Sequence, residues 1–324
     1  MHDKSSRNTV LAWGNKNRIY ILLFLVFVVM SLFAPKFFNP FNLTSIMRSF
    51  SMNACAAIGF TIVMICGQLD LSIGSIITLS GVIALGLKGQ LGYWGSVPVA
   101  IMIGALIGLI NGLLVAKGKI ISFIVTLGTM TILQGAIYQI TGGNSISLST
   151  PDAFAVSDFL TKRLFPLITP RVLITLLIAI LAEILLRRTR LGKNFYIVGG
   201  GKDSAWLAGI NTDNYTILAF VLSGTCAAIG GVLFAMESSA ATLTLGQQSL
   251  MYVLSATIIG GTSMAGGKGS VIQSVIAILT LEMLYTGIIL FGLGNEVKIF
   301  IAGLILALVV LYEAFAEYQH AKTV

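Results

Sequence analysis

The sequence predicts an all-α protein that crosses a lipid bilayer about ten times. Of its 324 residues, 56% are hydrophobic and only 10% are charged, and the mean hydropathy is +0.94. A water-soluble chain of this length needs a polar surface that this composition does not supply, whereas a lipid-embedded chain needs apolar side chains facing outward as well as inward. The apolar residues also come in long runs, and a bilayer core of about 30 Å is spanned by about 20 helical residues.

Ten apolar runs are long enough to be spans. Polar, glycine-rich segments adjoin the third and the eighth of them. The predicted spans are residues 18–34, 44–66, 71–88, 96–116, 120–141, 171–187, 215–237, 248–263, 270–291 and 297–314.

The basic residues predict how these spans are oriented. Residues 1–17 form a basic leader, residues 18–315 form the membrane domain, and residues 316–324 form a short tail. With ten spans, most of the 20 Lys and Arg residues lie on the same side as the leader. Because cytoplasmic loops are enriched in Lys and Arg, we expect both termini in the cytoplasm.

Two connections are longer than turns. Residues 142–170 are rich in Ser, Thr, Asp and Pro, which is typical of an exposed loop with a short helix, and this loop is expected outside the cytoplasm. Residues 187–216 are expected on the cytoplasmic side and mix aromatic and apolar residues with glycines and charges. That mixture is typical of a docking element rather than a tether.

The composition also excludes several kinds of chemistry. Cys55, Cys66 and Cys226 all lie in apolar runs, so we interpret them as small core residues and expect no disulfide and no metal site. His2 and His320 lie at the two ends of the chain, which leaves almost nothing from which to build a catalytic centre. The Lys and Arg residues flank apolar segments and do not form a patch with aromatics, which argues against nucleic acid as a partner.

Two segments of the sequence resemble each other. TIVMICGQLDLSIGSIITLSGVIAL (residues 61–85) and SATIIGGTSMAGGKGSVIQSVIAIL (255–279) both join an apolar run, a polar break rich in Gly and Ser, and a second apolar run. We call them the first and second echo segments. Transporters are often built from repeats with interrupted helices in matching positions. Turns between membrane hairpins also favour Gly and Ser for steric reasons, so both explanations stay open.

Asp70 lies in the polar break of the first echo segment. An ionised carboxylate within lipid costs about 2.5–3.5 kcal/mol, so it must be paired, face a cavity or lie at the interface. Asp70 or Ser72 could be the N-cap of the third span, where an oxygen accepts a free backbone N–H and a negative charge suits the helix dipole. The same helix start could also line a translocation path, and the two roles are compatible.

Other carboxylates also fall within predicted spans. Glu282 lies near the middle of the ninth span and must be protonated, paired or in contact with water. Glu183 and Glu237 lie nearer span ends, where an interfacial position is expected. The candidate path residues are Asp70, Ser72, Ser75, Thr262 and Glu282.

Small and amide residues are expected to serve helix packing. Gly104, Gly108 and Gly112 recur every four residues, which leaves one face of the fourth span bare for close backbone contact. Amides within spans can bind a hydroxylated solute, but they more often make hydrogen bonds between helices. These amides are Asn111, Gln134, Gln139 and Gln273.

Four blocks of the chain resemble one family, the membrane permease subunits of binding-protein-dependent ABC importers in the ribose and simple-sugar branch. They lie in order between about residues 40 and 315 and are GQLDLSIGS, NGLLVAKGKIISFIVTLGTM, RTRLGKNFYIVGGGKDSAWLAGIN and IIGGTSMAGGKGS. The sequence departs from the family at Gln68, where Gly is common, and at Gln247, Gln248 and Ser249, where an acidic residue is expected. These changes fall on hydrogen-bonding groups that would distinguish one sugar from another.

The resemblance implies a multi-pass permease of the bacterial cytoplasmic membrane that carries a small sugar or sugar-like solute. Its implied partners are cytoplasmic ABC ATPase subunits, an extracytoplasmic solute-binding protein, and a second permease subunit that is a second copy or a related chain. ATP and Mg²⁺ would be held by the ATPase subunits and no cofactor by this chain, which agrees with the absence of a GxxxxGK[ST] sequence.

The resemblance also implies that residues 187–216 contain the segment that couples the permease to the ATPase. Trp206, Leu207 and Ile210 are spaced to form a compact apolar knob on a short helix, which we call the knob. Gly199, Gly200 and Gly201 before it permit a tight turn. The candidate coupling residues are Lys202, Asp203, Ala205, Trp206, Leu207, Gly209 and Ile210.

Two other classes of protein compete with this interpretation. An ion-coupled secondary transporter of a small polar solute would also have about ten spans and intramembrane carboxylates, but it would need no ATPase. An intramembrane enzyme would need a nucleophile, an acid–base pair or a metal set, and the lack of internal histidine argues against it.

Overall fold

The structure is a computed structural model. It describes the backbone of residues 2–165 and 168–323 and the side chains of residues 17–165, 168–294 and 296–311, so the side chains of residues 1–16 in the leader and of the tail 316–324 lie outside the described residues. The helices are α1 (His2–Phe33), α2 (Pro40–Ile65), α3 (Ile73–Gly86), α4 (Lys88–Ala116), α5 (Ser122–Thr141), α6 (Pro151–Thr161), α7 (Pro170–Arg188), α8 (Arg190–Gly200), α9 (Lys202–Leu207), α10 (Thr212–Ser238), α11 (Leu245–Ile259), α12 (Val271–Leu290) and α13 (Asn295–Thr323).

The predicted fold class is confirmed, because each of the ten predicted spans falls on a helix. By length and composition, five helices among the described residues can cross a membrane, namely α2, α4, α5, α10 and α12. The helical stretch Asn17–Phe33 and helix α3 are apolar but shorter. In the described part of the chain, the strands are β1 (Ile146–Ser147) and β2 (Ala240–Ala241), which pair antiparallel.

Several helix boundaries follow from local signals in the sequence. Helix α2 begins at Pro40. Proline suits this position, because the N–H that it lacks would have no partner within the helix. The Asn39 side chain caps the helix by accepting the N–H of Phe41 at 3.0 Å. Helix α10 also begins at an asparagine cap, because the Asn211 side chain accepts the N–H of Asn214 at 3.2 Å.

Some boundaries differ from the sequence prediction. The segment before the fourth span is also helical, so α4 begins at Lys88, although the left-handed backbone of Gly92 (φ 61°) interrupts it. The loop of residues 142–170 contains β1 and α6, in agreement with its expected short helix. The loop of residues 187–216 is mostly helical and contains α8 and α9.

Helix α10 lies at the centre of the bundle and packs against α2, α3 and α4. The predicted glycine face of α4 lies against it. A Cβ on Gly104 would lie 2.5 Å from the Ala228 Cβ, one on Gly108 would lie 2.2 Å from the carbonyl oxygen of Phe220, and one on Gly112 would lie 2.8 Å from the Ile217 Cα. The two backbones therefore touch along this face, which any larger residue would separate.

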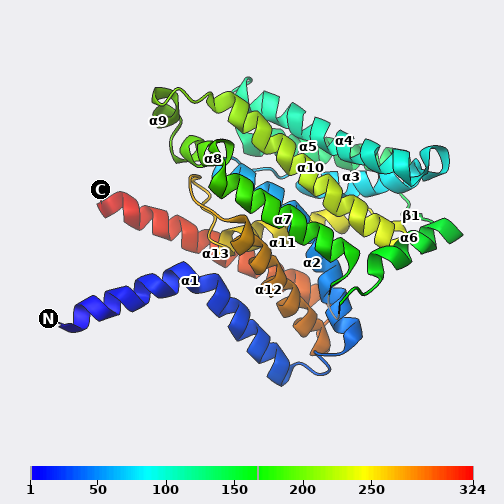
Figure 1. The fold of residues 1–324 in the computed structure, drawn as a ribbon, viewed down its shortest axis with the longest axis horizontal. Helices are drawn as coiled ribbons and strands as arrows, with labels where there is room; N and C mark the ends of the chain where they lie inside the picture. Colours follow the sequence, from blue (N-terminus) through cyan, green and yellow to red (C-terminus); the bar gives the residue numbers. More distant parts are fainter. Residues whose placement is uncertain (1, 166–167, 324) are drawn as a thin grey trace.

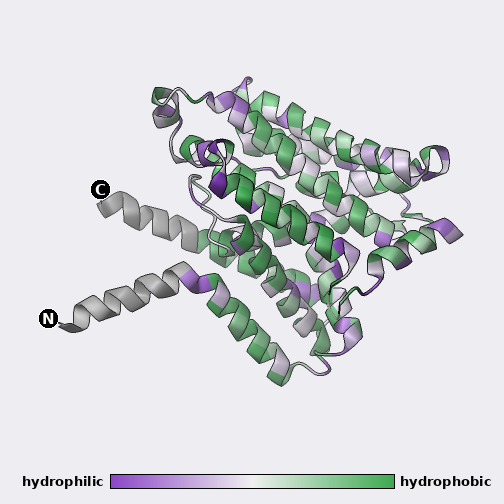
Figure 2. Cartoon of the chain, viewed as in Figure 1, coloured by the Kyte–Doolittle hydropathy of each residue, from purple (hydrophilic) through white to green (hydrophobic). Residues whose placement is uncertain are grey.

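Figure 1 shows the two ends of the bundle. The chain termini and helices α8 and α9 lie at one end, and α6 and β1 lie at the other. The apolar helices form the body of the bundle. Hydrophilic residues gather at α8 and near the opposite end of the bundle (Figure 2). At that opposite end the Lys88 ammonium donates to Asp152 at 2.7 Å, and this hydrogen bond holds the pKa of the Asp152 carboxyl below its usual range.

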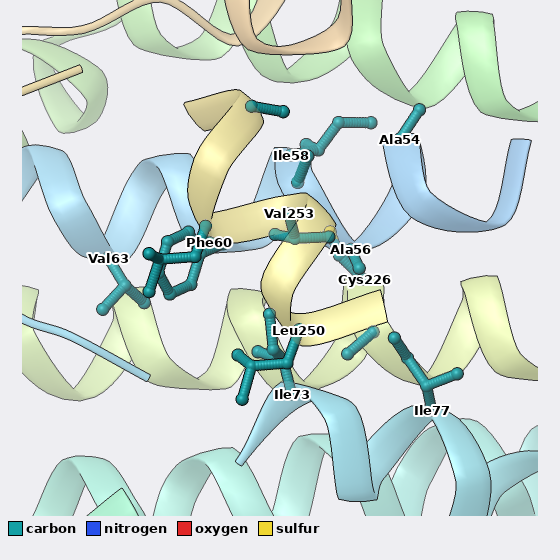
Figure 3. Packing of buried hydrophobic residues seen from close by; sticks show 14 of the residues in the cluster. Ala54, Ala56, Ile58, Phe60, Val63, Ile73, Ile77, Cys226, Leu250 and Val253 are labelled. Carbon is teal, nitrogen blue, oxygen red and sulfur yellow. The ribbon is translucent and has the colours of Figure 1, made fainter. Parts of the chain in front are cut away.

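The apolar core joins the two echo segments. Side chains from α2 and α3 in the first segment pack against α10 and against α11, which leads into the break of the second. Figure 3 shows part of this core, where Ile77 of the first segment lies near Ile58 and Phe60 of α2, Val253 of α11 and Cys226 of α10. Both echo segments fold as a helix, a break and a second helix.

Candidate functional site

Asp70 lies in the break between α2 and α3 and is completely buried. Its Oδ1 accepts the N–H of Ser72 at 3.1 Å and the Ser72 hydroxyl at 2.5 Å. Its Oδ2 accepts the Ser223 hydroxyl of α10 at 2.7 Å. The carboxylate therefore holds its own loop closed and fastens that loop to the central helix.

The hydrogen bonds continue from Asp70 to two further helices. The Asn111 side chain on α4 donates to the Ser72 hydroxyl at 2.9 Å and accepts the Thr129 hydroxyl of α5 at 2.6 Å. We call these five residues the Asp70 network. It joins α3, α4, α5 and α10, and Asn111 makes the hydrogen bonds between helices that its residue type predicts. Ser223 and Thr129 were not singled out in the sequence, because hydroxyl residues in apolar helices are common.

The N-cap expected at Asp70 or Ser72 is confirmed in its position, which is Ser72, but the expected cap hydrogen bond is absent. Ser72 occupies the N-cap position of α3, but its side chain accepts no N–H from the first turn of the helix. The backbone N–H that Asp70 accepts is that of Ser72, which precedes the helix. The physical reason is that the Ser72 hydroxyl is committed to Asp70 and Asn111, so it cannot turn toward the helix.

The other candidate path residues are also buried and bonded within the protein. The Ser75 hydroxyl donates to the carbonyl oxygen of Met130 on α5 at 2.9 Å. The Thr262 hydroxyl lies 3.5 Å from the Ser274 hydroxyl. Glu282 is 4% exposed and accepts the Asn53 side chain of α2 at 2.7 Å.

Aromatic rings and a cation surround the region of Glu282. The rings of Tyr252 and Tyr285 lie 4.6 Å apart, and the Lys298 ammonium lies 5.3 Å and 5.8 Å from their centres. The Asn53 Oδ1 and the Tyr285 hydroxyl are buried there without a hydrogen-bond partner. The sequence predicted Glu282 alone, because Asn53 lies 229 positions away on α2 and no local pattern singled out the aromatic residues near Glu282.

The described part of the chain contains a large apolar cavity, and none of the candidate path residues lines it. This cavity of about 490 Å³ lies between α1, α2 and α12 and is lined by apolar side chains and Tyr20. Within the described part of the chain, no cluster of three or more His, Cys, Asp or Glu residues is placed to hold a metal ion.

Glu183 and Glu237 lie near helix ends, as expected, and both side chains are buried within the protein and paired. Glu237 at the end of α10 forms ion pairs with Arg171 at 2.6 Å and with Arg48 at 2.5 Å. Glu183 on α7 forms an ion pair with Arg187. Each pair compensates for the cost of removing a charge from water.

The knob differs from its prediction in which residues it presents. On α9, Trp206 is 75% exposed and Leu207 is 79% exposed. Ala205 is fully buried, and Ile210 packs against the main core, so these two face the bundle. Gly209 has a left-handed backbone (φ 72°) and ends the helix, with no atom near enough to suggest close approach. Lys202 and Asp203, at the start of α9, are exposed.

A bundle of apolar helices with two broken segments, each held by buried polar side chains, is the architecture of a membrane transport protein. Residues 42–310 match the family described as "Branched-chain amino acid transport system / permease component". The chain belongs to this family of permease components.

Curated relatives agree with this assignment. The ribose import permease protein of Escherichia coli strain K12 is 32% identical over 304 residues, which cover 93% of this chain and 94% of that protein. The D-allose transport system permease protein of the same strain is 30% identical over 312 residues, or 95% and 94% of the two chains. The autoinducer 2 import system permease protein of Yersinia pestis strain Pestoides F is 30% identical over 297 residues, or 89% and 81%.

The resemblance to permeases of simple-sugar importers is therefore confirmed. No solved structure matches the chain.

The Asp70 network predicts a stability difference between two substitutions. Asp70→Ala leaves the hydroxyls of Ser72 and Ser223 without their acceptor, so we expect a loss of about 1–3 kcal/mol in the free energy of unfolding. Asp70→Asn keeps one oxygen for Ser72, and the Ser223 hydroxyl can turn to accept the amide, so its loss should be smaller.

Thermal unfolding of the detergent-solubilised protein measures both effects. Asp213→Ala is the matched control, because Asp213 forms an exposed ion pair with Lys119 and surface pairs contribute little. An Asp70→Ala protein that unfolds at the wild-type temperature would show that the network does not hold the break.

Proposed function

We propose that this permease is half of the pore of an ATP-driven importer and carries a small sugar or sugar-like solute. Relatives across nearly the whole chain are named for import of ribose, D-allose and autoinducer 2, which supports a small, polar, hydroxyl-bearing solute. The solute is delivered by an extracytoplasmic binding protein.

The pore needs a second permease subunit, either a second copy or a related chain. The candidate path residues are at most 6% exposed and bonded within the chain, which supports a path that runs along the outside of one bundle and is completed by another. Helix α5 supports the same proposal. Only 17% of its most apolar stretch is buried within this chain, so most of that stretch is free to contact a second subunit.

The observation that carries the ATPase assignment is the exposed pair Trp206 and Leu207 on α9. Two large apolar side chains on a six-residue helix at one end of the bundle suit a groove in a cytoplasmic partner. The partner is an ABC ATPase subunit that holds ATP and Mg²⁺, and this chain binds no cofactor of its own.

The importer lies in the bacterial cytoplasmic membrane with both termini in the cytoplasm. The termini lie at the same end of the bundle as α8 and α9, which supports a common cytoplasmic side (Figure 1). Residues 142–170, with α6, then lie on the side from which the binding protein delivers the solute.

The docking assignment predicts that Trp206→Ala and Leu207→Asp weaken ATPase binding. Truncation of a buried anchor costs about 2 kcal/mol or more in a complex, which corresponds to a loss of about 30-fold in affinity. Both side chains are exposed in the permease, so its own unfolding temperature should not change. The measurement is retention of the ATPase on the solubilised permease.

Trp94→Ala is the matched control for this experiment. Trp94 is 96% exposed but lies near the start of α4, away from α9. It should retain the ATPase fully. Full retention by Trp206→Ala and Leu207→Asp as well would refute the docking assignment.

The orientation predicts opposite labelling of two introduced cysteines. Ser149 lies in the loop before α6 and Lys193 lies on α8, and both are exposed. An impermeant thiol reagent applied to intact cells should label Ser149→Cys alone, and Lys193→Cys should react only after the membrane is opened. The native cysteines are buried and should not compete. Labelling of both positions from outside would contradict the orientation.

A further inference from the structure

Helix α12 begins against a carboxylate from another helix. Its first backbone N–H groups, those of Val271 and Ile272, both donate to Oε2 of Glu183 at 2.8 Å and 3.3 Å. Glu183 lies on α7, 88 positions earlier in the chain. A negative charge at this position compensates the positive end of the helix dipole, so α7 holds the start of α12 in a fixed place.

The second oxygen of Glu183 completes this attachment. Oε1 accepts the Ser270 hydroxyl at 2.9 Å and also the Nε of Arg187. The Arg187 guanidinium donates in turn to the Ser270 hydroxyl at 3.3 Å. Glu183 is 5% exposed, and each of its oxygens has two donors.

Helix α8 touches the same break of the second echo segment. The Tyr196 hydroxyl donates to the carbonyl oxygen of Gly269 at 3.0 Å. One turn later, a Cβ on Gly199 would lie 2.7 Å from the backbone nitrogen of Gly267 and 1.8 Å from the carbonyl oxygen of Ile65. Gly199 thus makes a close backbone contact, and the tight turn expected at Gly199, Gly200 and Gly201 falls at Gly201, which alone separates α8 from α9.

Helix α8 is also fixed to α7. A Cβ on Gly192 would lie 2.0 Å from the carbonyl oxygen of Leu185, which leaves no room for sliding between the two helices. The end of α7, α8 and the start of α12 are therefore joined by close contacts and by a buried charge. Helix α9, with the exposed Trp206 and Leu207, follows α8 directly.

We propose that Glu183 is the positioning residue that passes movement of α8 and α9 to the start of α12. The proposal rests on the proposed function, because the ATPase is what moves α9. When the ATPase displaces the knob, α8 moves with it, and Glu183 makes α12 and the second break follow. Without the carboxylate the ATPase still binds and hydrolyses ATP, but α12 no longer moves in step.

The test is the coupling ratio, defined as solute taken up per ATP hydrolysed, in vesicles that contain permease, ATPase and loaded binding protein. Glu183→Gln keeps the size of the side chain but presents an amide N–H₂ to groups that are all donors. We expect a fall of about fivefold or more in the ratio, as for loss of a coupling energy between sites, with ATP hydrolysis maintained. An unchanged ratio would overturn the proposal.

Glu237→Gln is the matched control. Glu237 is also buried and paired with arginine, but it joins α2, α7 and α10 at the other end of the bundle. It should lower the unfolding temperature without lowering the ratio. An equal fall of the ratio in both variants would show that any lost buried charge has this effect, and the proposal would be wrong.

A gentler pair of variants covers the case in which Glu183→Gln does not assemble. Tyr196→Phe removes only the hydroxyl that binds Gly269, whereas Tyr215→Phe removes a hydroxyl that binds Asn194 of the same helix α8. Tyr196→Phe should lower the ratio and Tyr215→Phe should not, and the wild-type ratio in Tyr196→Phe would overturn the proposal. A wild-type permease that takes up solute without ATP would refute the proposed function itself.

Discussion

Inside a bilayer every polar group must find its partner within the protein, because lipid offers none. This constraint is most severe where a helix is interrupted, since free N–H groups then lie in an apolar environment. The chain meets it at its two breaks with two buried carboxylates. Asp70 closes the first break onto α10, and Glu183 holds the start of the helix that follows the second.

The two breaks are also in contact with each other. The N–H of Gly267 in the second donates to the carbonyl oxygen of Ile65, at the end of α2, at 2.9 Å. Gly67 and Gly199 complete this contact, and a Cβ on Gly266 would lie 2.7 Å from atoms of both. Helix α8 therefore touches both breaks, and the end of the bundle that carries the knob is connected through backbone to its polar interior.

Features that depend on local composition were predictable, and those that depend on distant pairing were not. Hydropathy predicted the helices, and the spacing of Gly104, Gly108 and Gly112 predicted a close packing face, because both are read along one helix. Glu183 pairs with Arg187 four positions later, but the Val271 N–H that it accepts lies 88 positions away, so no local pattern contains that contact. The Asp70 cap failed for a related reason, because Asn111 on another helix determines how the Ser72 hydroxyl points.

The central claim is that ATP, hydrolysed by a separate subunit, drives uptake through this chain. The direct measurement is accumulation of labelled ribose or a related sugar in vesicles that contain the permease, with ATPase, binding protein and ion gradients supplied separately. We expect accumulation only when ATP, the ATPase and the loaded binding protein are all present, with collapsed ion gradients making no difference. Accumulation driven by an ion gradient through the permease alone would contradict it and would identify a secondary transporter.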